Sequence, residues 1–317
     1  MKILVTGGAG FIGSHLIDRL IDKGEDVVCV DNLLLGKKEH LNGVMQNKHF
    51  QLHEFDLLDL DKLDLLFATE KFDVVYHLAA NSDIQLGHSK TMTDLNNTFL
   101  TTFNILSCMK THKVQKIVFA SSSAIYGETN EAVSEDTGPL LPISNYGAAK
   151  LASEAYISSF CENYGVRSWM IRFPNVIGWR LTHGVIYDFL NKLEKNPSEL
   201  LVLGDGMQQK PYLYVDDLLD AIECIFNSSD NKVNIYNVAA ASVTTVKEIA
   251  EMVLRVTGLE NTKISFTGET RGWIGDVPKF SYDIAKVSSL NWSPAMTSNQ
   301  AVMLSIEKEL EYRKENL

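Results

Sequence analysis

Short runs of apolar residues alternate with longer amphipathic segments through the first half of the chain. The runs predict buried strands at residues 2–6, 27–31, 50–53, 73–78, 116–121 and 166–173. The segments between them predict helices at residues 12–23, 60–69, 93–111 and 145–164. Because strands and helices alternate with short connections, this half favours an α/β fold. It is a doubly wound parallel sheet of the Rossmann type, covered on both faces.

The second half of the chain is less regular. It predicts helices at residues 184–196, 244–257 and 298–314, a strand at 234–238, and a strand end that runs into a helix over 212–226. Thr244 and Thr245 introduce the second of these helices as its cap. We expect residues 1–176 to form the Rossmann domain, with an element near 212–240 returning to it. Residues 177–317 then form mainly a smaller α+β domain that holds a substrate.

The composition is that of a globular protein. Of the 317 residues, 45% are hydrophobic and 22% are charged, and the formal net charge is -11 without a basic block. This balance argues against a nucleic-acid partner and against an anionic membrane surface. No apolar run approaches the length of a membrane span, and the first residues read as a strand rather than a leader. We therefore expect a cytoplasmic protein.

The cysteines are far apart in the sequence and stand mostly in apolar runs: Cys29, Cys108, Cys161 and Cys224. None pairs with a second cysteine or a histidine at a metal-ligand spacing. We expect free, mostly buried thiols in a reducing compartment, and no metal site. His77, at the end of the fourth predicted strand, is expected to support that strand end rather than to bind a metal.

Three glycines separate the first strand from the first helix. Gly7, Gly10 and Gly13 stand three residues apart, one residue wider than the tighter dinucleotide fingerprint. Such a turn at a helix N-terminus offers backbone amides to a pyrophosphate and leaves no side chain in its way. Asp31 ends the second strand, eighteen residues after Gly13. Its carboxylate can accept hydrogen bonds from ribose hydroxyls and would repel a 2′-phosphate, which predicts NAD rather than NADP.

A tyrosine and a lysine stand four residues apart in the fourth predicted helix, so Tyr146 and Lys150 share one face. At its ordinary pKa of about 10 a tyrosine is a poor base. The Lys150 ammonium and the charge of an oxidised nicotinamide would stabilise the Tyr146 phenolate. Upstream, Ser121, Ser122 and Ser123 follow the fifth strand, at the sheet edge where such folds bind ligands. A serine there can hold the substrate oxygen whose proton the tyrosine removes.

These features occur together with two further motifs in one order: TGGAGFIG, HLAA, SSSAIYG, YGAAK and RFPNVIG. In that order the chain resembles the extended short-chain dehydrogenases/reductases of the NAD-dependent epimerase/dehydratase family. The resemblance runs from residue 1 to roughly residue 296. It implies a Rossmann fold, NAD as the cofactor and a nucleotide sugar as the substrate.

Site residues follow from the same resemblance, position by position. It implies catalytic roles for Ser122, Tyr146 and Lys150, as the substrate-holding hydroxyl, the base and the partner of the base. The implied cofactor contacts are Gly7, Gly10, Phe11, Ile12, Asp31, Asn32, Asp56, Leu57, Leu78, Ala79, Ala80, Asn97, Tyr146 and Lys150. The implied substrate contacts are Ser122, Ser123, Asn175, Arg180, Lys210 and Arg271.

The chain departs from the family pattern in two respects. The family's 4,6-dehydratases carry acidic residues at the two positions after the catalytic serine or threonine. Here these are Ser123 and Ala124, which cannot act as acid or base, so dehydration and decarboxylation are disfavoured. Where the family usually has an arginine, this chain has Lys210, which keeps a cation but loses the bidentate fork. Lys210, Arg180 and Arg271 are all candidates to hold the diphosphate.

The expected reaction is therefore NAD-dependent hydride transfer at C4 of a nucleotide sugar. The leading hypothesis is a 4-epimerase acting on a UDP-hexose. A 4-dehydrogenase or 4-ketoreductase, for example one acting on a GDP-heptose, would use the same residues. A dinucleotide-binding protein without chemistry is disfavoured, because Ser122, Tyr146 and Lys150 are all present. The resemblance also implies a role in polysaccharide biosynthesis and a homodimer formed through a four-helix bundle of the 93–111 and 145–164 helices.

Overall fold

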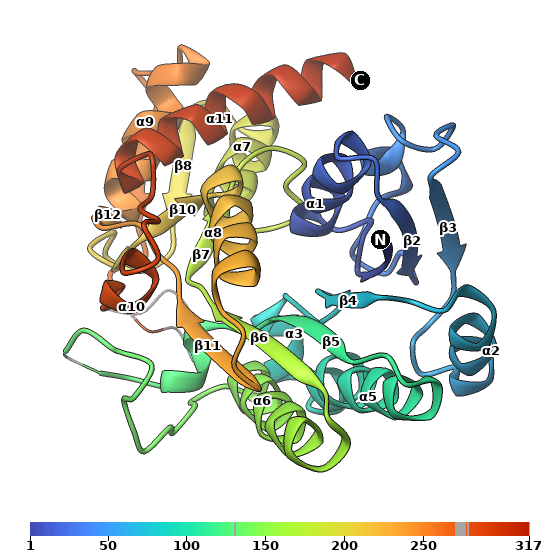
Figure 1. Cartoon of the computed structure of the whole chain (residues 1–317). Coiled ribbons are helices and arrows are strands. Elements are labelled where there is room, and N and C mark those ends of the chain that lie inside the picture. The colour runs from blue at the N-terminus through green and yellow to red at the C-terminus, as the bar shows by residue number, and fades with distance from the viewer. Residues whose placement is uncertain (130, 270–276, 278, 317) are drawn as a thin grey trace. The chain divides into compact units, whose positions relative to one another are not determined.

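The computed structural model describes residues 1–129, 131–269, 277 and 279–316. These fall into two compact units (Figure 1). The first unit contains Met1–Gly127, Pro139–Arg172 and Ile222–Tyr236. The second unit contains Glu128–Gly138, Phe173–Ala221 and Asn237–Leu317.

A seven-stranded sheet forms the centre of the first unit, in the order β11-β6-β5-β4-β1-β2-β3. Every pairing from β6 to β3 is parallel. The strands are β1 (Lys2–Thr6), β2 (Asp26–Asp31), β3 (Phe50–Glu54), β4 (Val74–His77), β5 (Lys116–Ala120), β6 (Arg167–Arg172) and β11 (Val233–Asn237). The predicted doubly wound sheet is thus confirmed. All six strands expected in the first half are present, and the strand expected at 234–238 joins the same sheet.

Helices and short turns connect these strands. They are α1 (Phe11–Asp22), η1 (Lys38–Leu41), α2 (Leu60–Glu70), α3 (Ile84–Ser89), α4 (Met92–Asp94), η2 (Leu95–Leu100), α5 (Thr101–His112), η3 (Ser123–Tyr126) and α6 (Asn145–Tyr164). In Figure 1, α5 and α6 run side by side along the sheet, in agreement with their direct contacts.

The prediction of one continuous helix at residues 93–111 is wrong. The structure divides this segment into α4, the π-helical segment η2 and α5. The hydroxyls of Thr101 and Thr102 both donate to the carbonyl of Thr98, at 3.1 and 2.7 Å. Such bonds compete with the regular helical ladder, which explains the irregular turn.

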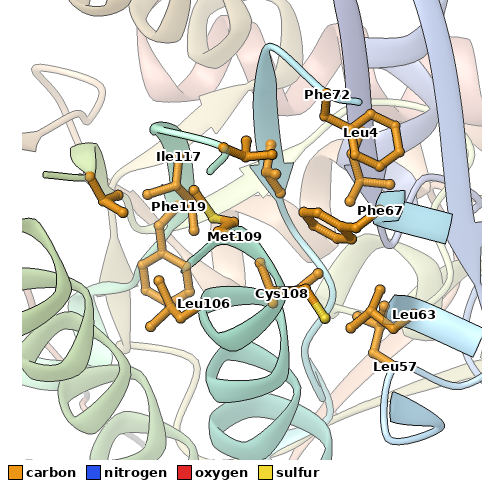
Figure 2. Packing of buried hydrophobic residues seen from close by; sticks show 14 of the residues in the cluster. Leu4, Leu57, Leu63, Phe67, Phe72, Leu106, Cys108, Met109, Ile117 and Phe119 are labelled. Atoms are coloured by element: carbon orange, nitrogen blue, oxygen red, sulfur yellow. The ribbon is translucent and has the colours of Figure 1, made fainter. Parts of the chain in front are cut away.

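The core of the first unit lies between the sheet and helices α2, α5 and α6 (Figure 2). Leu4 of β1 and Phe119 of β5 lie on the sheet side of this cluster and are fully buried. Phe67 of α2 and Phe72 meet edge to face, with ring centroids 5.2 Å apart. This packing fixes the sheet against α5 and α6, and so fixes the strand ends relative to α6.

The described residues of the second unit form three small two-stranded sheets and several helices. The parallel pairs are β7 (Asn175–Ile177) with β10 (Tyr212–Tyr214), and β8 (Glu199–Val202) with β13 (Lys263–Phe266); β9 (Gln209–Lys210) pairs antiparallel with β12 (Thr244–Thr245). Its helices are α7 (Val185–Lys195), α9 (Val246–Thr257), α10 (Ala285–Ser288) and α11 (Ser298–Glu315), and α8 (Val215–Ser228) continues into the first unit.

Local sequence explains where two of the second-unit helices begin. Thr245 and Glu248 form a reciprocal capping box at the start of α9, which confirms the cap predicted there. Thr297 and Gln300 form the same motif at the start of α11. Among the residues that the structure describes, no helix has both the length and the apolar character needed to cross a membrane.

Candidate active site

The glycine turn after β1 packs tightly against the end of β4. Gly7 has a left-handed φ of +70°, and a Cβ atom there would lie 2.7 Å from the amide nitrogen of Ala79. A Cβ atom on Gly13 would lie 2.2 Å from the carbonyl oxygen of Gly7. Neither position accepts a side chain without displacing backbone. Gly10 is the N-cap of α1, and a glycine has no side chain that could bind the amides of the first helical turn. These backbone amides can therefore bind an anion.

Asp31 joins this turn to the end of β2. Its carboxylate accepts hydrogen bonds from the amides of Ala9 at 2.9 Å and Leu33 at 2.8 Å. Burial raises the pKa of Asp31, and the two amide bonds act in the opposite direction. Each oxygen still has a lone pair for a ribose hydroxyl. The Asp31 carboxylate is therefore fixed beside the glycine turn, as a dinucleotide requires.

The other predicted cofactor residues line the same edge of the sheet or lie close to it. Asn32 donates to the Asp56 carboxylate at 3.0 Å. The side chain of Leu57 is buried in the core, and its carbonyl accepts a hydrogen bond from Asn104 at 2.9 Å. The Ala79 amide donates to the Thr6 hydroxyl at 3.3 Å, and Leu78 and Ala80 flank Ala79 in the loop after β4. Phe11 and Ile12 are the first two residues of α1. Asn97 lies in η2 and is half-buried. Together with the glycine turn, these residues fit a bound dinucleotide.

Ser122 and Tyr146 meet at this edge. Ser122 follows β5 and caps the short η3 turn, where its hydroxyl accepts a hydrogen bond from the Ala124 amide at 3.2 Å. Tyr146 stands in the first turn of α6, which begins after the Ser144 cap. The Ser122 hydroxyl lies close enough to the Tyr146 phenol to lower its pKa. Two of the three residues predicted as catalytic are therefore close together.

Lys150, one turn further along α6, is fully buried. Its ammonium donates to the carbonyl of Ala120 at 2.6 Å and lies over the Phe119 ring, 4.8 Å from the centroid. It lies 5.8 Å from the centroid of the Tyr146 ring. Burial lowers the pKa of Lys150 to about 7, while Glu154 and Asp94 raise it.

The expected stabilisation of the Tyr146 phenolate depends on two positive charges, that of Lys150 and that of an oxidised nicotinamide. Burial raises the pKa of Tyr146 to about 12, the hydrogen bond with Ser122 lowers it, and the Asp94 carboxylate raises it. Desolvation of the phenol is the largest of these causes. This result agrees with the expectation that the charge of an oxidised nicotinamide helps to stabilise the phenolate.

Sequence reasoning missed a buried ion pair behind these three residues. Arg172, the last residue of β6, binds Glu154 of α6 in a bidentate manner, at 3.0 and 2.7 Å. The Ser121 hydroxyl donates to the same carboxylate at 2.6 Å. Arg172 also donates to the Tyr126 hydroxyl at 2.9 Å. Two features of the sequence could have indicated this pair: an arginine that ends an otherwise apolar strand, and a glutamate four residues after Lys150.

His77 has the supporting role expected of it. It is fully buried and lies between the hydroxyls of Thr6, at 2.7 Å, and Thr102, at 3.0 Å. Burial lowers the pKa of His77 to about 3, and the nearby Lys150 acts in the same direction. The imidazole is therefore neutral and links β1 and β4 to α5.

The predicted substrate residues beyond Ser122 and Ser123 lie elsewhere in the chain. Asn175 opens β7 and is exposed, and Lys210 lies in β9, paired with Thr244 of β12. Arg180 is buried, with its guanidinium 4.1 Å from the centroid of the Trp179 ring. These residues belong to the second unit. Arg271 lies outside the described residues.

A parallel doubly wound sheet with a glycine turn after its first strand, and a serine, tyrosine and lysine at its edge, defines the extended short-chain dehydrogenase/reductase class. The model of the NAD dependent epimerase/dehydratase family matches residues 3–239. The chain belongs to this family of NAD-dependent enzymes.

Individual relatives agree with this assignment. A putative UDP-glucose 4-epimerase of Methanocaldococcus jannaschii is 33% identical over 308 residues, covering 95% of each chain. A crystal structure of a UDP-galactose 4-epimerase superposes with a TM-score of 0.86 and 38% identity, covering 99% of each chain. The UDP-glucose 4-epimerase of Thermotoga maritima, crystallised with UDP-glucose, gives a TM-score of 0.89 with 30% identity over the whole of both chains.

Proposed function

We propose that this protein is an NAD-dependent 4-epimerase of nucleotide sugars, with a UDP-hexose as its substrate. The observation that carries the proposal is the hydrogen bond from Lys150 to the Ala120 carbonyl, which holds the helix of Tyr146 against the serine turn after β5. The relatives named as UDP-glucose 4-epimerases support the same substrate class.

Each of the three proposed catalytic residues has a defined part in this reaction. Ser122 holds the C4 oxygen of the sugar, and Tyr146 takes the proton from that oxygen. Lys150 binds ribose hydroxyls of the cofactor and places its positive charge near the phenol. When bound, NAD supplies the acceptor for the C4 hydride and returns it. The 4-keto sugar turns between the two transfers, so the reaction has no net redox change.

The turn after Ser122 argues against dehydration. Ser123 and Ala124 have no group that titrates in the useful range, and the Ala124 amide is already bound to the Ser122 hydroxyl. Elimination across C5 and C6 needs both an acid and a base near the sugar. The proposed reaction is therefore confined to C4.

The proposal extends to the division of labour within the chain. Residues 1–176, with the returning element near 212–240, would bind NAD, and residues 177–317 would mainly bind the nucleotide sugar. Asn175, Arg180, Lys210 and Arg271 are proposed to contact its diphosphate. The four cysteines are free thiols, which supports a reducing cytoplasm. A nucleotide-sugar epimerase there would supply polysaccharide biosynthesis.

A homodimer is also proposed, through a surface that we call the α5–α6 aromatic patch: Phe99, Phe103, Tyr156, Phe160 and Tyr164. Phe99 and Phe103 meet the Tyr156 ring edge-on, with centroids 5.1 and 5.8 Å away. Phe160 and Tyr164 form a second such pair at 4.9 Å. Phe103, Tyr156 and Tyr164 are exposed. Aromatic side chains gathered on exposed helices are typical of a protein interface.

Incubation of the purified enzyme with UDP-, GDP- and dTDP-sugars, followed by NMR of the products, tests the proposed function. A UDP-sugar product with inverted configuration at C4 supports the proposed function. Epimerisation of a GDP- or dTDP-sugar instead would show that the proposed nucleotide, UDP, is wrong. A released 4-keto sugar with stoichiometric NADH would instead identify a 4-dehydrogenase. Cofactor released by denaturation gives its identity and redox state. NADP in that extract, or a product that lacks the C6 oxygen, would overturn the proposal.

A further inference from the structure

The ion pair between Glu154 and Arg172 is almost completely buried, with 5% and 3% of these residues exposed. Burying two charges costs free energy that their attraction often fails to recover, and apolar residues of similar size can replace such pairs without loss of stability. The pair is therefore poorly explained by stability alone. Its other hydrogen bonds indicate a different purpose.

Those bonds reach both ends of the segment that carries Ser122. At one end, Ser121 donates to the Glu154 carboxylate at 2.6 Å. At the other end, Arg172 donates to the hydroxyl of Tyr126, the last residue of η3, at 2.9 Å. One ion pair thus holds both ends of the short stretch between Ser121 and Tyr126, with Ser122 inside it.

Glu154 also shares a helix with the base. Tyr146, Lys150 and Glu154 follow at intervals of four residues in α6, and so lie along one side of it. A displacement of Glu154 relative to Arg172 would move the Ser122 segment against α6.

We propose that Glu154 and Arg172 are positioning residues, which hold the Ser122 hydroxyl in register with the Tyr146 phenol by binding Ser121 and Tyr126. The inference deepens the proposed function, on which its kinetic test rests. Geometry of this kind has a large effect on rate, because a misplacement of about 1 Å can cost roughly 10²-fold in turnover. Neither residue touches the reacting atoms in this proposal.

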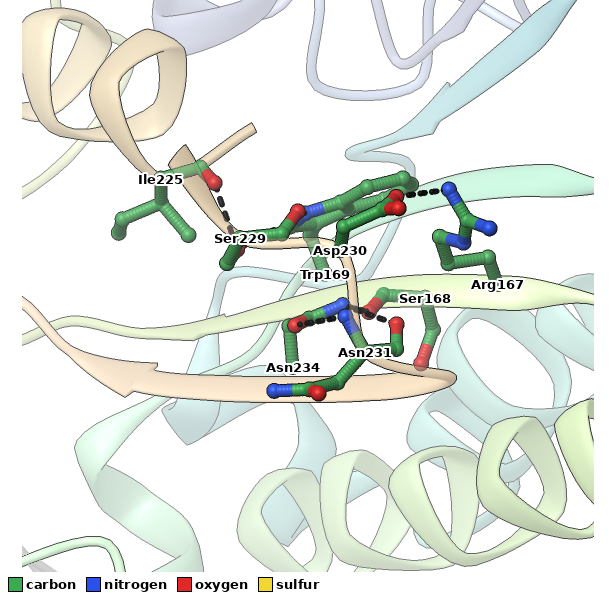
Figure 3. Close-up of polar contacts among 8 residues, drawn as sticks. All are labelled: Arg167, Ser168, Trp169, Ile225, Ser229, Asp230, Asn231 and Asn234. Atoms are coloured by element: carbon green, nitrogen blue, oxygen red, sulfur yellow. Dashed lines mark hydrogen bonds and ion pairs between the residues drawn. The ribbon is translucent and has the colours of Figure 1, made fainter. Parts of the chain in front are cut away.

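Three variants test the proposal: Tyr126→Phe and Ser121→Ala each remove one contact of the network, and Glu154→Gln removes the charge of the ion pair. Ser229→Ala is the matched control, at a residue that contacts Trp169 of β6 (Figure 3). The buried Ser229 hydroxyl accepts a hydrogen bond from Trp169 at 3.1 Å and donates to the Ile225 carbonyl at 2.6 Å. The control therefore loses buried hydrogen bonds of similar quality without touching the Ser122 segment.

The kinetic readout is kcat against KM for the nucleotide sugar. We expect kcat to fall roughly tenfold or more in Tyr126→Phe and Glu154→Gln, with KM and NAD binding changed less than about twofold. Ser229→Ala should lose thermal stability and keep its kcat. Equal kcat values in the network variants and the control would overturn the proposal. Because Glu154→Gln can fail to fold, Tyr126→Phe and Ser121→Ala carry the comparison in that case.

Hydrogen–deuterium exchange supplies a readout that needs no substrate. Peptides that cover residues 121–126 should exchange faster in Tyr126→Phe and Ser121→Ala than in the wild-type protein, whereas Ser229→Ala should leave them unchanged. Unchanged exchange of that segment in both network variants overturns the proposal. If the wild-type enzyme converts no nucleotide sugar, the proposed function fails, and the exchange experiment still decides whether the pair holds the segment.

Discussion

The Ser122 hydroxyl lies close enough to the Tyr146 phenol to lower its pKa, although the two residues lie on opposite sides of a long connection. Ser122 follows β5 at the carboxyl edge of the parallel sheet, and Tyr146 stands in the first turn of the helix that leads into β6. The sheet topology brings them together at the edge where such folds bind their ligands. Their proximity places a base next to a group that can hold its substrate oxygen.

The first prediction concerns the base itself. Tyr146→Phe removes only the hydroxyl, so turnover should fall by at least roughly 10²-fold, as expected for a positioned base. NAD binding and the circular dichroism spectrum should remain those of the wild type. Tyr164→Phe, at the exposed end of the same helix, is the control and should keep full activity. A Tyr146→Phe enzyme with more than about a tenth of the wild-type turnover would contradict the mechanism.

The arrangement around Tyr146 was only partly predictable from sequence. The spacing of Tyr146 and Lys150 on one helix face, and the position of Ser122 after a parallel strand, follow from local pattern and topology. The pKa values of the phenol and the ammonium do not, because burial by distant elements is their largest cause. The Glu154–Arg172 pair was missed for a similar reason: its partners meet only after α6 packs on the sheet.

The fold, too, was only partly predictable from the sequence. Apolar runs predicted six strands of the large sheet, because five of them are buried almost throughout and read continuously in the sequence. The sixth, β3, is an edge strand in which only Phe50 is buried. The two-residue strands β9 and β12 are too short to show any periodicity. The break at η2 depends on threonine hydroxyls that bond to a single carbonyl, which the apolar pattern does not report.

The second prediction concerns stability against pH, through His77. The folded protein holds the pKa of His77 at about 3, whereas an unfolded chain has a histidine pKa of about 6.5. Below about pH 6.5 the unfolded chain binds one more proton, so the free energy of unfolding falls by ~1.4 kcal/mol per pH unit until the folded pKa is approached. Chemical denaturation between pH 7 and about pH 4 measures this slope.

The matched variant is His77→Gln, which keeps a polar group between Thr6 and Thr102 and cannot titrate. For this variant, the free energy of unfolding should change less steeply with pH than in the wild type, by the contribution of one proton. Parallel curves for the two proteins would mean that His77 is not held neutral in the fold.

The third prediction concerns the choice of dinucleotide. Asp31→Ala should weaken NAD binding, because it removes the ribose acceptor and the bonds that hold the Ala9 and Leu33 amides. Asp31→Asn is the sharper variant, since it keeps one acceptor and removes the charge. Its preference for NAD over NADP should narrow by about fivefold, which corresponds to the ~1 kcal/mol of repulsion between two like charges about 4 Å apart in water. Fluorescence titration measures both affinities, and a preference for NADP in the unmodified protein would refute the role of Asp31.

The fourth prediction concerns the proposed dimer. A double change, Phe103→Glu and Tyr156→Glu, places two charges in the α5–α6 aromatic patch, where their burial across an interface would be costly. Analytical ultracentrifugation should show two chains for the wild type and one for the variant. Leu65→Glu, at an exposed leucine of α2 outside the patch, should leave the mass unchanged. A wild-type protein that sediments as a single chain excludes this interface.

The last prediction concerns the atoms that exchange during the reaction. Loss of water across C5 and C6 needs a base for the C5 proton and an acid for the leaving hydroxyl, and Ser123 and Ala124 offer neither. If Tyr146 served in either role, C4 would lose its base. The C5 hydrogen should therefore survive a reaction run in D₂O, and the product should keep its C6 oxygen.

A substrate with deuterium at C4 tests the complementary step. In an epimerase the same hydride returns, so NMR should find deuterium retained at the inverted C4 centre and none washed out to solvent. Deuterium on the cofactor with a free ketone would identify a dehydrogenase that uses the same Ser122, Tyr146 and Lys150. Deuterium gained at C5 in D₂O, or a 6-deoxy product, would show that another residue supplies the missing acid and base, and the restriction to C4 would then be wrong.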